Sequence, residues 1–212
     1  MTEIDTQGVG WQGRDAEFIH YLHSLVERDD RTTLAALRRG LGKEPGTASE
    51  MYPHVVPFLP GGKGLRDEMP YYLVAALFGW HQKDWSSDGQ RPNLGGSLAQ
   101  LRRQQANERG TEPEQGDSTE RRFVAVLSST FDDLPYHLRQ MIGLLRTKEV
   151  PVNWRQLLSD LKHWEDDDRY VQRDWARSFW KQRPPEQPAD QGQEPSIPTD
   201  GSEPSDDESF TA

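Results

Sequence analysis

The sequence predicts an all-α protein: a compact helical bundle body in two packed halves, followed by a disordered acidic C-terminal tail. Apolar residues recur at steps of three and four in segment after segment, which is the period of an amphipathic helix. No segment shows sustained alternation rich in β-branched residues, so no strand is expected. Charge and proline are unevenly distributed, because residues 184–212 contain six prolines and no basic residue.

Composition divides the chain into an arm, a body and a tail. Residues 1–13 are polar and contain glycine, with Trp11 as the only large apolar anchor, and are predicted to be a flexible N-terminal arm. The tail, 184–212, has eight acidic residues and only Ile197 and Phe210 as large apolar side chains, too few to offset the entropy of folding. The helical body is therefore expected at 14–183.

The first half of the body, about 14–107, is predicted to contain the central buried helix. Residues 67–81 form its most apolar segment, with Asp67 as the expected N-cap and Pro70 in the first turn. A short segment at 51–59 is expected to be bounded or kinked by its two prolines. The other predicted helices of this half are 14–28, with the apolar face Phe18, Ile19, Leu22, Leu25 and Val26; 31–40, with Leu34 and Leu37; and 94–107, with Leu94, Leu98 and Leu101.

The second half, about 118–183, follows a polar stretch at 108–117 and is predicted to contain four helices. Their starts carry capping signals: Asp117 with Glu120, Asp133 with Pro135, and Asn153 with Gln156. The predicted helices are 118–129, with Phe123, Val126 and Leu127 inward; one opening at Asp133, with Leu138, Met141, Ile142 and Leu145; one after Asn153, with Leu157, Leu158, Leu161 and Trp164; and 167–182, with Val171, Trp175 and Phe179.

The net charge of −10 belongs to the two ends of the chain. All 25 Lys and Arg residues lie between Arg14 and Arg183. Two acidic residues precede this region and eight follow it, which leaves 25 of the 35 inside it. The body is formally neutral, so a basic surface can arise only from the arrangement of its charges. An acidic total therefore does not exclude nucleic acid as a partner.

Arginines are the candidate functional residues, because the guanidinium group recognises phosphate with two parallel hydrogen bonds. Three adjacent pairs occur, and two further arginines seven residues apart share one flank of a predicted helix. The alternative is that these arginines line solvated helix faces and form ion pairs within the fold. The candidate nucleic-acid-binding residues are Arg38, Arg39, Arg102, Arg103, Arg121, Arg122, Arg139 and Arg146.

No catalytic site, metal site or cofactor is predicted. The chain has no cysteine, which removes disulfides and thiolate chemistry. Glu17 and His20, like Asp160 and His163, have the spacing of helical di-iron sites, but the apolar faces supply no further inward carboxylates. No apolar run approaches a membrane span and no signal pattern opens the chain, so a cytoplasmic protein without membrane contact is expected.

Six segments together resemble one family, the CasB proteins, which are the small subunit of the type I-E CRISPR Cascade complex. Their order and spacing through the body carry the resemblance more than any single motif does. The segments are LAALRRGLG at 34–42, MYPHVVPFLP at 51–60, NLGGSLAQLRR at 93–103, ERRFVAVL at 120–127, LPYHLRQMIGLL at 134–145 and VNWRQLLSDLKHW at 152–164.

The resemblance implies a non-catalytic helical subunit present in two copies beside the backbone subunits and the large PAM-reading subunit of Cascade. Basic residues of this family contact guide RNA and target DNA, especially the displaced non-target strand of the R-loop. All the candidate arginines lie within matching segments except Arg146, which lies just beyond one. Two other functions stay open: a protein–protein spacer without nucleic-acid contact, and a metal-dependent helical oxidase.

Overall fold

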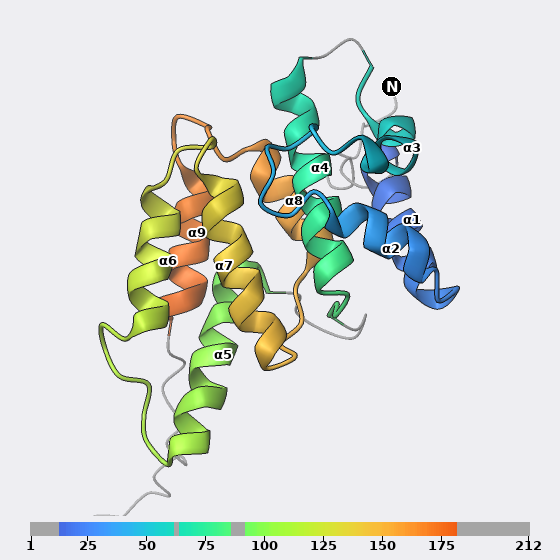
Figure 1. Cartoon of the computed structure of the whole chain (residues 1–212). Helices are drawn as coiled ribbons and strands as arrows, with labels where there is room; N and C mark the ends of the chain where they lie inside the picture. Colours follow the sequence, from blue (N-terminus) through green and yellow to red (C-terminus); the bar gives the residue numbers. More distant parts are fainter. Residues whose placement is uncertain (1–12, 62–63, 86–91, 182–212) are drawn as a thin grey trace, which may run out of the picture. The chain divides into compact units, whose positions relative to one another are not determined.

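The computed structural model describes residues 13–61, 64–85 and 92–181. Within these ranges the chain is helical, and its only β pairing is an isolated bridge between Asp84 and Val152. The predicted all-α fold is therefore confirmed (Figure 1). The predicted acidic tail and nearly all of the predicted N-terminal arm lie outside the described residues.

Nine α-helices and two short 3-10 helices make up the described part of the body. Their bounds are α1 Arg14–Glu27, α2 Arg31–Arg38, η1 Ser49–Met51, α3 Tyr52–Val55, η2 Val56–Phe58, α4 Leu65–Trp80, α5 Leu94–Arg109, α6 Ser118–Ser128, α7 Leu134–Thr147, α8 Trp154–Lys162 and α9 Tyr170–Trp180.

Helix α4 is the central buried helix, as predicted. Every residue from Pro70 to Gly79 is buried, because α2, α7 and α8 all pack against α4. The helix begins earlier than predicted: Gly64 is the N-cap, so Asp67 lies within the first turn and Pro70 within the second. The prediction of Asp67 as N-cap was wrong, because the N-cap lies three residues upstream, at a glycine that has no side chain to accept a capping hydrogen bond.

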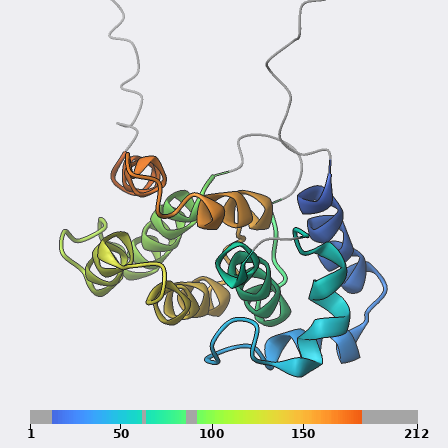
Figure 2. The same cartoon turned by 90° about the horizontal axis from the view of Figure 1, so that it is seen from above.

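The helices form two groups, but these groups do not follow the two predicted halves of the chain. One group contains α5, α6, α7 and α9, and the other contains α1 to α4 and α8 (Figure 1). Helix α5 lies between α7 and α9 (Figure 2), while α8 packs on α1 and α4. Each predicted half thus gives helices to both groups, and the residues 13–181 that are described share one continuous apolar core.

Side-chain caps mark the start of four of the described α-helices, α2, α5, α6 and α8, whereas Asp133 is the N-cap of α7 without a side-chain capping bond. Asp117 accepts a 2.8 Å hydrogen bond from the backbone N–H of Glu120, and Asn153 accepts one of 3.0 Å from Gln156. Helix α9 starts at Tyr170, later than the predicted 167, because Arg169 has a left-handed backbone with φ of 50°. Val26 was predicted to face the core but is exposed at the end of α1.

None of the helices in the described ranges is both long and apolar enough to span a bilayer.

Candidate nucleic-acid interface

Helix α7 presents a surface without acidic residues. Its buried side is formed by Leu138, Ile142 and Leu145, and the 100° step per residue therefore turns Tyr136 and Gln140 outward. The sequence from 134 to 147 contains no Asp or Glu. Basic side chains flank this outward ridge on both sides.

On one flank, Arg38 and Arg146 lie near the C-terminal end of α4, and Arg139 lies against the loop that follows α2. Arg38 Nε donates a 3.1 Å hydrogen bond to the carbonyl oxygen of Gly79, and the guanidinium of Arg146 lies 5.5 Å from the ring centre of Trp80. Both arginines therefore contact consecutive residues of α4. We call Arg38, Arg139 and Arg146 the α2–α7 cluster.

Arg139 joins this cluster through the loop that follows α2. A Cβ atom placed on Gly42 would lie 2.6 Å from Arg139 Nη1, so the guanidinium rests directly against the loop backbone. Gly42 has φ of +74°, where glycine is favoured. Arg139 of α7 thus contacts the loop that follows α2, although the two segments are distant in the sequence.

On the other flank, α6 and α7 enclose an open groove of about 360 Å³. Arg121 and Arg122 come from α6, and Tyr136, His137 and Gln140 come from α7. The residues lining this α6–α7 groove are completed by Ser118, Ala125 and Met141. None of the described residues that line the groove carries a carboxylate.

The three helices that bear these arginines, α2, α6 and α7, contain a single acidic residue, Glu120. Its carboxylate is occupied inside the fold: Oε2 lies 3.0 Å from Arg102 Nη2, and Oε1 accepts a 3.2 Å hydrogen bond from the indole of Trp180. Among the described residues, Arg121, Arg122, Arg139 and Arg146 form no ion pair with a carboxylate. A formally neutral body therefore carries a local excess of positive charge here.

Arg102 does not belong to this surface, although the sequence made it a candidate. Its side chain is only 8% exposed, because Asp117, Glu120 and the ring of Phe179 surround the guanidinium. Nη2 also donates a 2.7 Å hydrogen bond to the carbonyl of Glu114. The physical reason is the apolar face of α5, which carries Arg102 inward beside Leu98 and Leu101. Its guanidinium ties α5 to the start of α6.

The remaining candidates are exposed but lie apart from both flanks of α7. Arg39 forms an ion pair with Glu50 at 3.0 Å, which ties the end of α2 to η1. Arg103 lies on the exposed side of α5. The structure thus brings together five of the eight predicted arginines around α7 and separates the other three.

Sequence reasoning missed Tyr136, His137 and Gln140. Each was read only as part of an amphipathic helix, yet all three line the α6–α7 groove. The absence of any acidic residue from 134 to 147 was the available signal.

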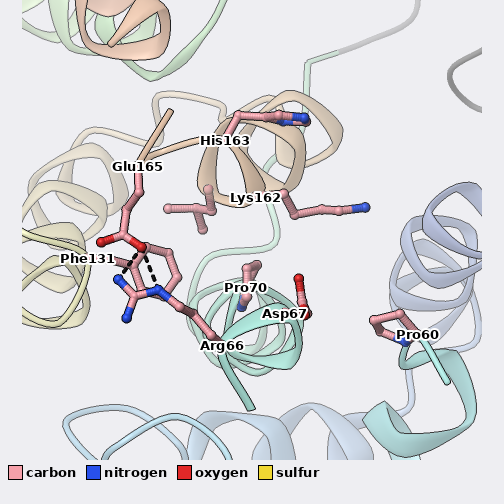
Figure 3. Close-up of a pocket in the computed structure, with 9 residues that line it drawn as sticks. Pro60, Arg66, Asp67, Pro70, Phe131, Lys162, His163 and Glu165 are labelled. Carbon is pink, nitrogen blue, oxygen red and sulfur yellow. Dashed lines mark hydrogen bonds and ion pairs between the residues drawn. The ribbon is translucent and has the colours of Figure 1, made fainter. Parts of the chain in front are cut away.

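A second hollow, of about 300 Å³, lies between α4, α8 and the segment before α7 (Figure 3). Its cations are already paired: Arg66 forms an ion pair with Glu165 and lies 5.6 Å from the ring centre of Phe131. Lys162 points away from that pair and meets Asp15 at 2.6 Å. The two ion pairs of this hollow therefore serve packing within the fold, one between α4 and the segment after α8 and the other between α8 and α1.

The two carboxylate–histidine pairs do not form a metal centre. Asp160 is buried and accepts hydrogen bonds from Gln156 and from the indole of Trp175, and burial raises its pKa to about 6. His163 instead bonds the backbone oxygen of Ser159. Glu17 and His20 are exposed. The part of the chain that the structure describes contains no group of three or more His, Asp or Glu residues able to hold a metal ion.

Residues 33–180 match the family model of the CRISPR-associated protein Cse2. A Thermus thermophilus protein named CRISPR-associated protein Cse2 is 34% identical over 148 residues, which cover 69% of this chain and 77% of that protein. The fold is similar to the crystal structure of CasB from Thermus thermophilus, with 28% identity, a TM-score of 0.64, and coverage of 80% of this chain and 99% of that one.

Two further solved structures have the same fold. M. ruber CasB is 32% identical with a TM-score of 0.62, covering 79% of this chain and 93% of that chain. A chain of a CRISPR RNA-guided surveillance complex is 28% identical with a TM-score of 0.60, covering 78% of this chain and 91% of its own length. Family model, sequence relative and solved structures agree, and the chain belongs to the CRISPR-associated Cse2 family.

Proposed function

We propose that this protein is the non-catalytic small subunit of a type I-E CRISPR surveillance complex, where it braces the R-loop. Its partners are the backbone and large PAM-reading subunits of Cascade, a second copy of itself, guide RNA and target DNA. The observation that carries the proposal is the arginine-lined surface around α7. The helices α2, α6 and α7, which bear these arginines, contain one carboxylate, and that carboxylate, Glu120, is paired with Arg102. Membership of the Cse2 family and similarity to a chain of a surveillance complex support it.

The mechanism is electrostatic. Guide pairing reads the sequence, and the heteroduplex is about as stable as the DNA duplex it replaces. Small additional contacts to the backbone of the displaced strand therefore shift the balance toward the open R-loop. The arginines of the α2–α7 cluster and of the α6–α7 groove supply such contacts, because guanidinium binds phosphate without regard to base identity.

Charge reversal at Arg121 and Arg122 tests the proposal in the assembled complex. The double variant R121E/R122E is expected to shorten R-loop lifetime by a similar factor on targets of different sequence, since only phosphate contacts are lost. The matched control is R173E/R177E, because Arg173 and Arg177 are exposed arginines of α9, which lies on the other side of α5 from α7 (Figure 2). A loss restricted to particular targets, or no loss beyond that of R173E/R177E, contradicts the proposal.

A second candidate function is a spacer between protein subunits that does not contact nucleic acid. It is favoured by the formal neutrality of the body and by Arg39 and Arg102, two candidate phosphate ligands that instead form ion pairs within the chain. Photo-crosslinking from the displaced strand separates the two functions. Crosslinks that reach α6 or α7 support bracing, whereas a complete R-loop complex without any crosslink to this chain supports the spacer.

The metal-dependent oxidase has no structural support among the described residues, since the spacing pairs at 17–20 and 160–163 do not converge. Elemental analysis of the purified protein tests it. Stoichiometric iron or manganese would support the oxidase function, and protein without either metal would exclude it.

A further inference from the structure

The exposed side chain of Tyr136 has no evident role in folding. It is 66% exposed, the highest value among the large apolar and aromatic side chains that the structure describes. Its neighbours in the core, Leu134 and Leu138, are fully buried, so α7 is anchored without it. Among the described residues, the only ring contact of Tyr136 is with the adjacent His137, edge to face at 5.3 Å between centroids.

Other exposed aromatic residues differ in this respect. The hydroxyl of Tyr52 donates to the carbonyl of Gly46, and its ring packs against Tyr72. The indole of Trp180 donates to Glu120, and its ring packs on Phe123. These side chains stabilise the fold through both their polar and their apolar parts, whereas Tyr136 leaves its ring and hydroxyl to solvent.

The surroundings of Tyr136 indicate a ligand with both charge and an aromatic face. The ring lines the α6–α7 groove together with Arg121 and Arg122, while Ala125 and Met141 provide apolar surface. An aromatic ring beside unpaired arginines is the combination by which proteins hold single-stranded nucleic acid, with the base stacked on the ring and the phosphates on the cations. In a duplex the base faces are covered by their neighbours and are not available to such a ring.

We propose that the α6–α7 groove binds an unpaired nucleobase on the ring of Tyr136 while Arg121 and Arg122 hold neighbouring phosphates. The groove therefore selects single-stranded over duplex nucleic acid. This inference rests on the proposed function and deepens it, because it assigns selectivity for single strands to one residue. Stacking is tolerant of base identity, so the groove does not read sequence.

The first experiment compares Y136A, Y136F and R121E/R122E in binding a labelled 30-nucleotide oligothymidine and the matching duplex. Y136A is expected to weaken single-strand binding about tenfold, with unchanged duplex binding and unchanged salt dependence, because no phosphate contact is lost. Y136F retains the ring and is expected to bind as the unmodified protein does. R121E/R122E weakens binding of both probes.

Failure of the inference is distinguishable from failure of the proposed function. If R121E/R122E loses affinity and Y136A does not, or if Y136A loses single-strand and duplex binding equally, stacking on Tyr136 is overturned while the phosphate contacts stand. If neither probe binds the unmodified chain or its assembled complex, both proposals fail. Thermal unfolding of Y136A serves as the folding control, and no change is expected at so exposed a position.

A second measurement uses the assembled complex. Thymines of the displaced strand are replaced one at a time by 5-iodouracil, which crosslinks to a stacked aromatic ring on irradiation. A crosslinked peptide containing Tyr136 supports the inference. Crosslinks that reach other parts of this chain but never Tyr136, or a Tyr136 ring that is covered by a neighbouring subunit, overturn it.

Discussion

Arg102 Nε donates a 2.8 Å hydrogen bond to Asp117 Oδ2, and this pair joins the middle of α5 to the N-cap of α6. Asp117 also accepts the backbone N–H of Glu120 through its other oxygen. The carboxylate of Asp117 therefore caps the N-terminus of α6 and also attaches α6 to α5 through its ion pair with the buried guanidinium of Arg102.

Truncation of Arg102 is expected to destabilise the protein. R102A leaves Asp117 and Glu120 without their cation in a partly buried site, which costs about 3 kcal/mol of the free energy of unfolding. R103A, which removes the exposed neighbour, is expected to change it by less than about 0.5 kcal/mol. Denaturant unfolding measures both, and equal effects of the two variants would show that the buried pair contributes nothing specific.

The close approach of α5 and α9 depends on Gly95. A Cβ atom at this position would lie 2.1 Å from the backbone oxygen of Trp175, which cannot move without shifting α9. G95A is expected to lower the free energy of unfolding by about 3 kcal/mol, the upper end of the usual cost of overpacking. G64A is the control, because nothing lies near its Cβ position; a cost below about 1 kcal/mol is expected. An unaffected G95A would mean that the two helices can separate freely.

The helical fold could be predicted because its signals are local. The apolar period, the N-caps Asp117 and Asn153, and the uniformly apolar segment of α4 each depend on residues close in sequence. The grouping of helices could not be predicted, since it depends on contacts such as that of Gly95 with Trp175, which lie far apart in the chain.

The candidate interface was only partly predictable, because residue types can be read from the sequence and contacts between distant segments cannot. Arginines could be recognised as phosphate ligands, but their burial could not: Arg102 and Arg103 are adjacent, yet one lies inside an ion-pair cluster and the other in solvent. The outward orientation of Tyr136 follows from its place opposite the apolar face of α7, but its position beside the arginines of α6 could not be predicted. Only the packing of α6 against α7 places it beside Arg121 and Arg122.

Asp160 is expected to make stability depend on pH. Burial raises its pKa to about 6 in the folded protein, above the ordinary 3.8 of the unfolded chain. Between these values the folded state binds a proton that the unfolded state has released, so the contribution of Asp160 to stability falls as pH rises. The resulting loss in the free energy of unfolding amounts to at most about 3 kcal/mol and is complete above pH 6.

The variant D160N isolates this effect. Its unfolding free energy, subtracted from that of the unmodified protein at each pH, should give a curve that descends between about pH 4 and 6. D167N is the control, because Asp167 is an exposed carboxylate of the loop between α8 and α9. A flat difference curve for D160N, or the same descent for D167N, would contradict the assignment to Asp160.

Arg139 and Arg146 are expected to contribute to nucleic-acid binding through charge alone. Each phosphate contact to a single strand adds about 0.7 to the slope of log affinity against log salt. R139Q should therefore weaken binding of the 30-nucleotide oligothymidine at low salt and reduce that slope by about 0.7, and R139Q/R146Q should reduce it by about twice as much. Because the Arg139 guanidinium rests against the loop at Gly42 and that of Arg146 packs on Trp80, thermal unfolding of both variants serves as the folding control. R173Q/R177Q removes the same charge from α9, where both arginines are exposed, and is expected to leave the slope unchanged. An unchanged slope in R139Q/R146Q, or an equal reduction in the α9 variant, would mean that the α2–α7 cluster does not hold phosphates and that any binding rests on net charge.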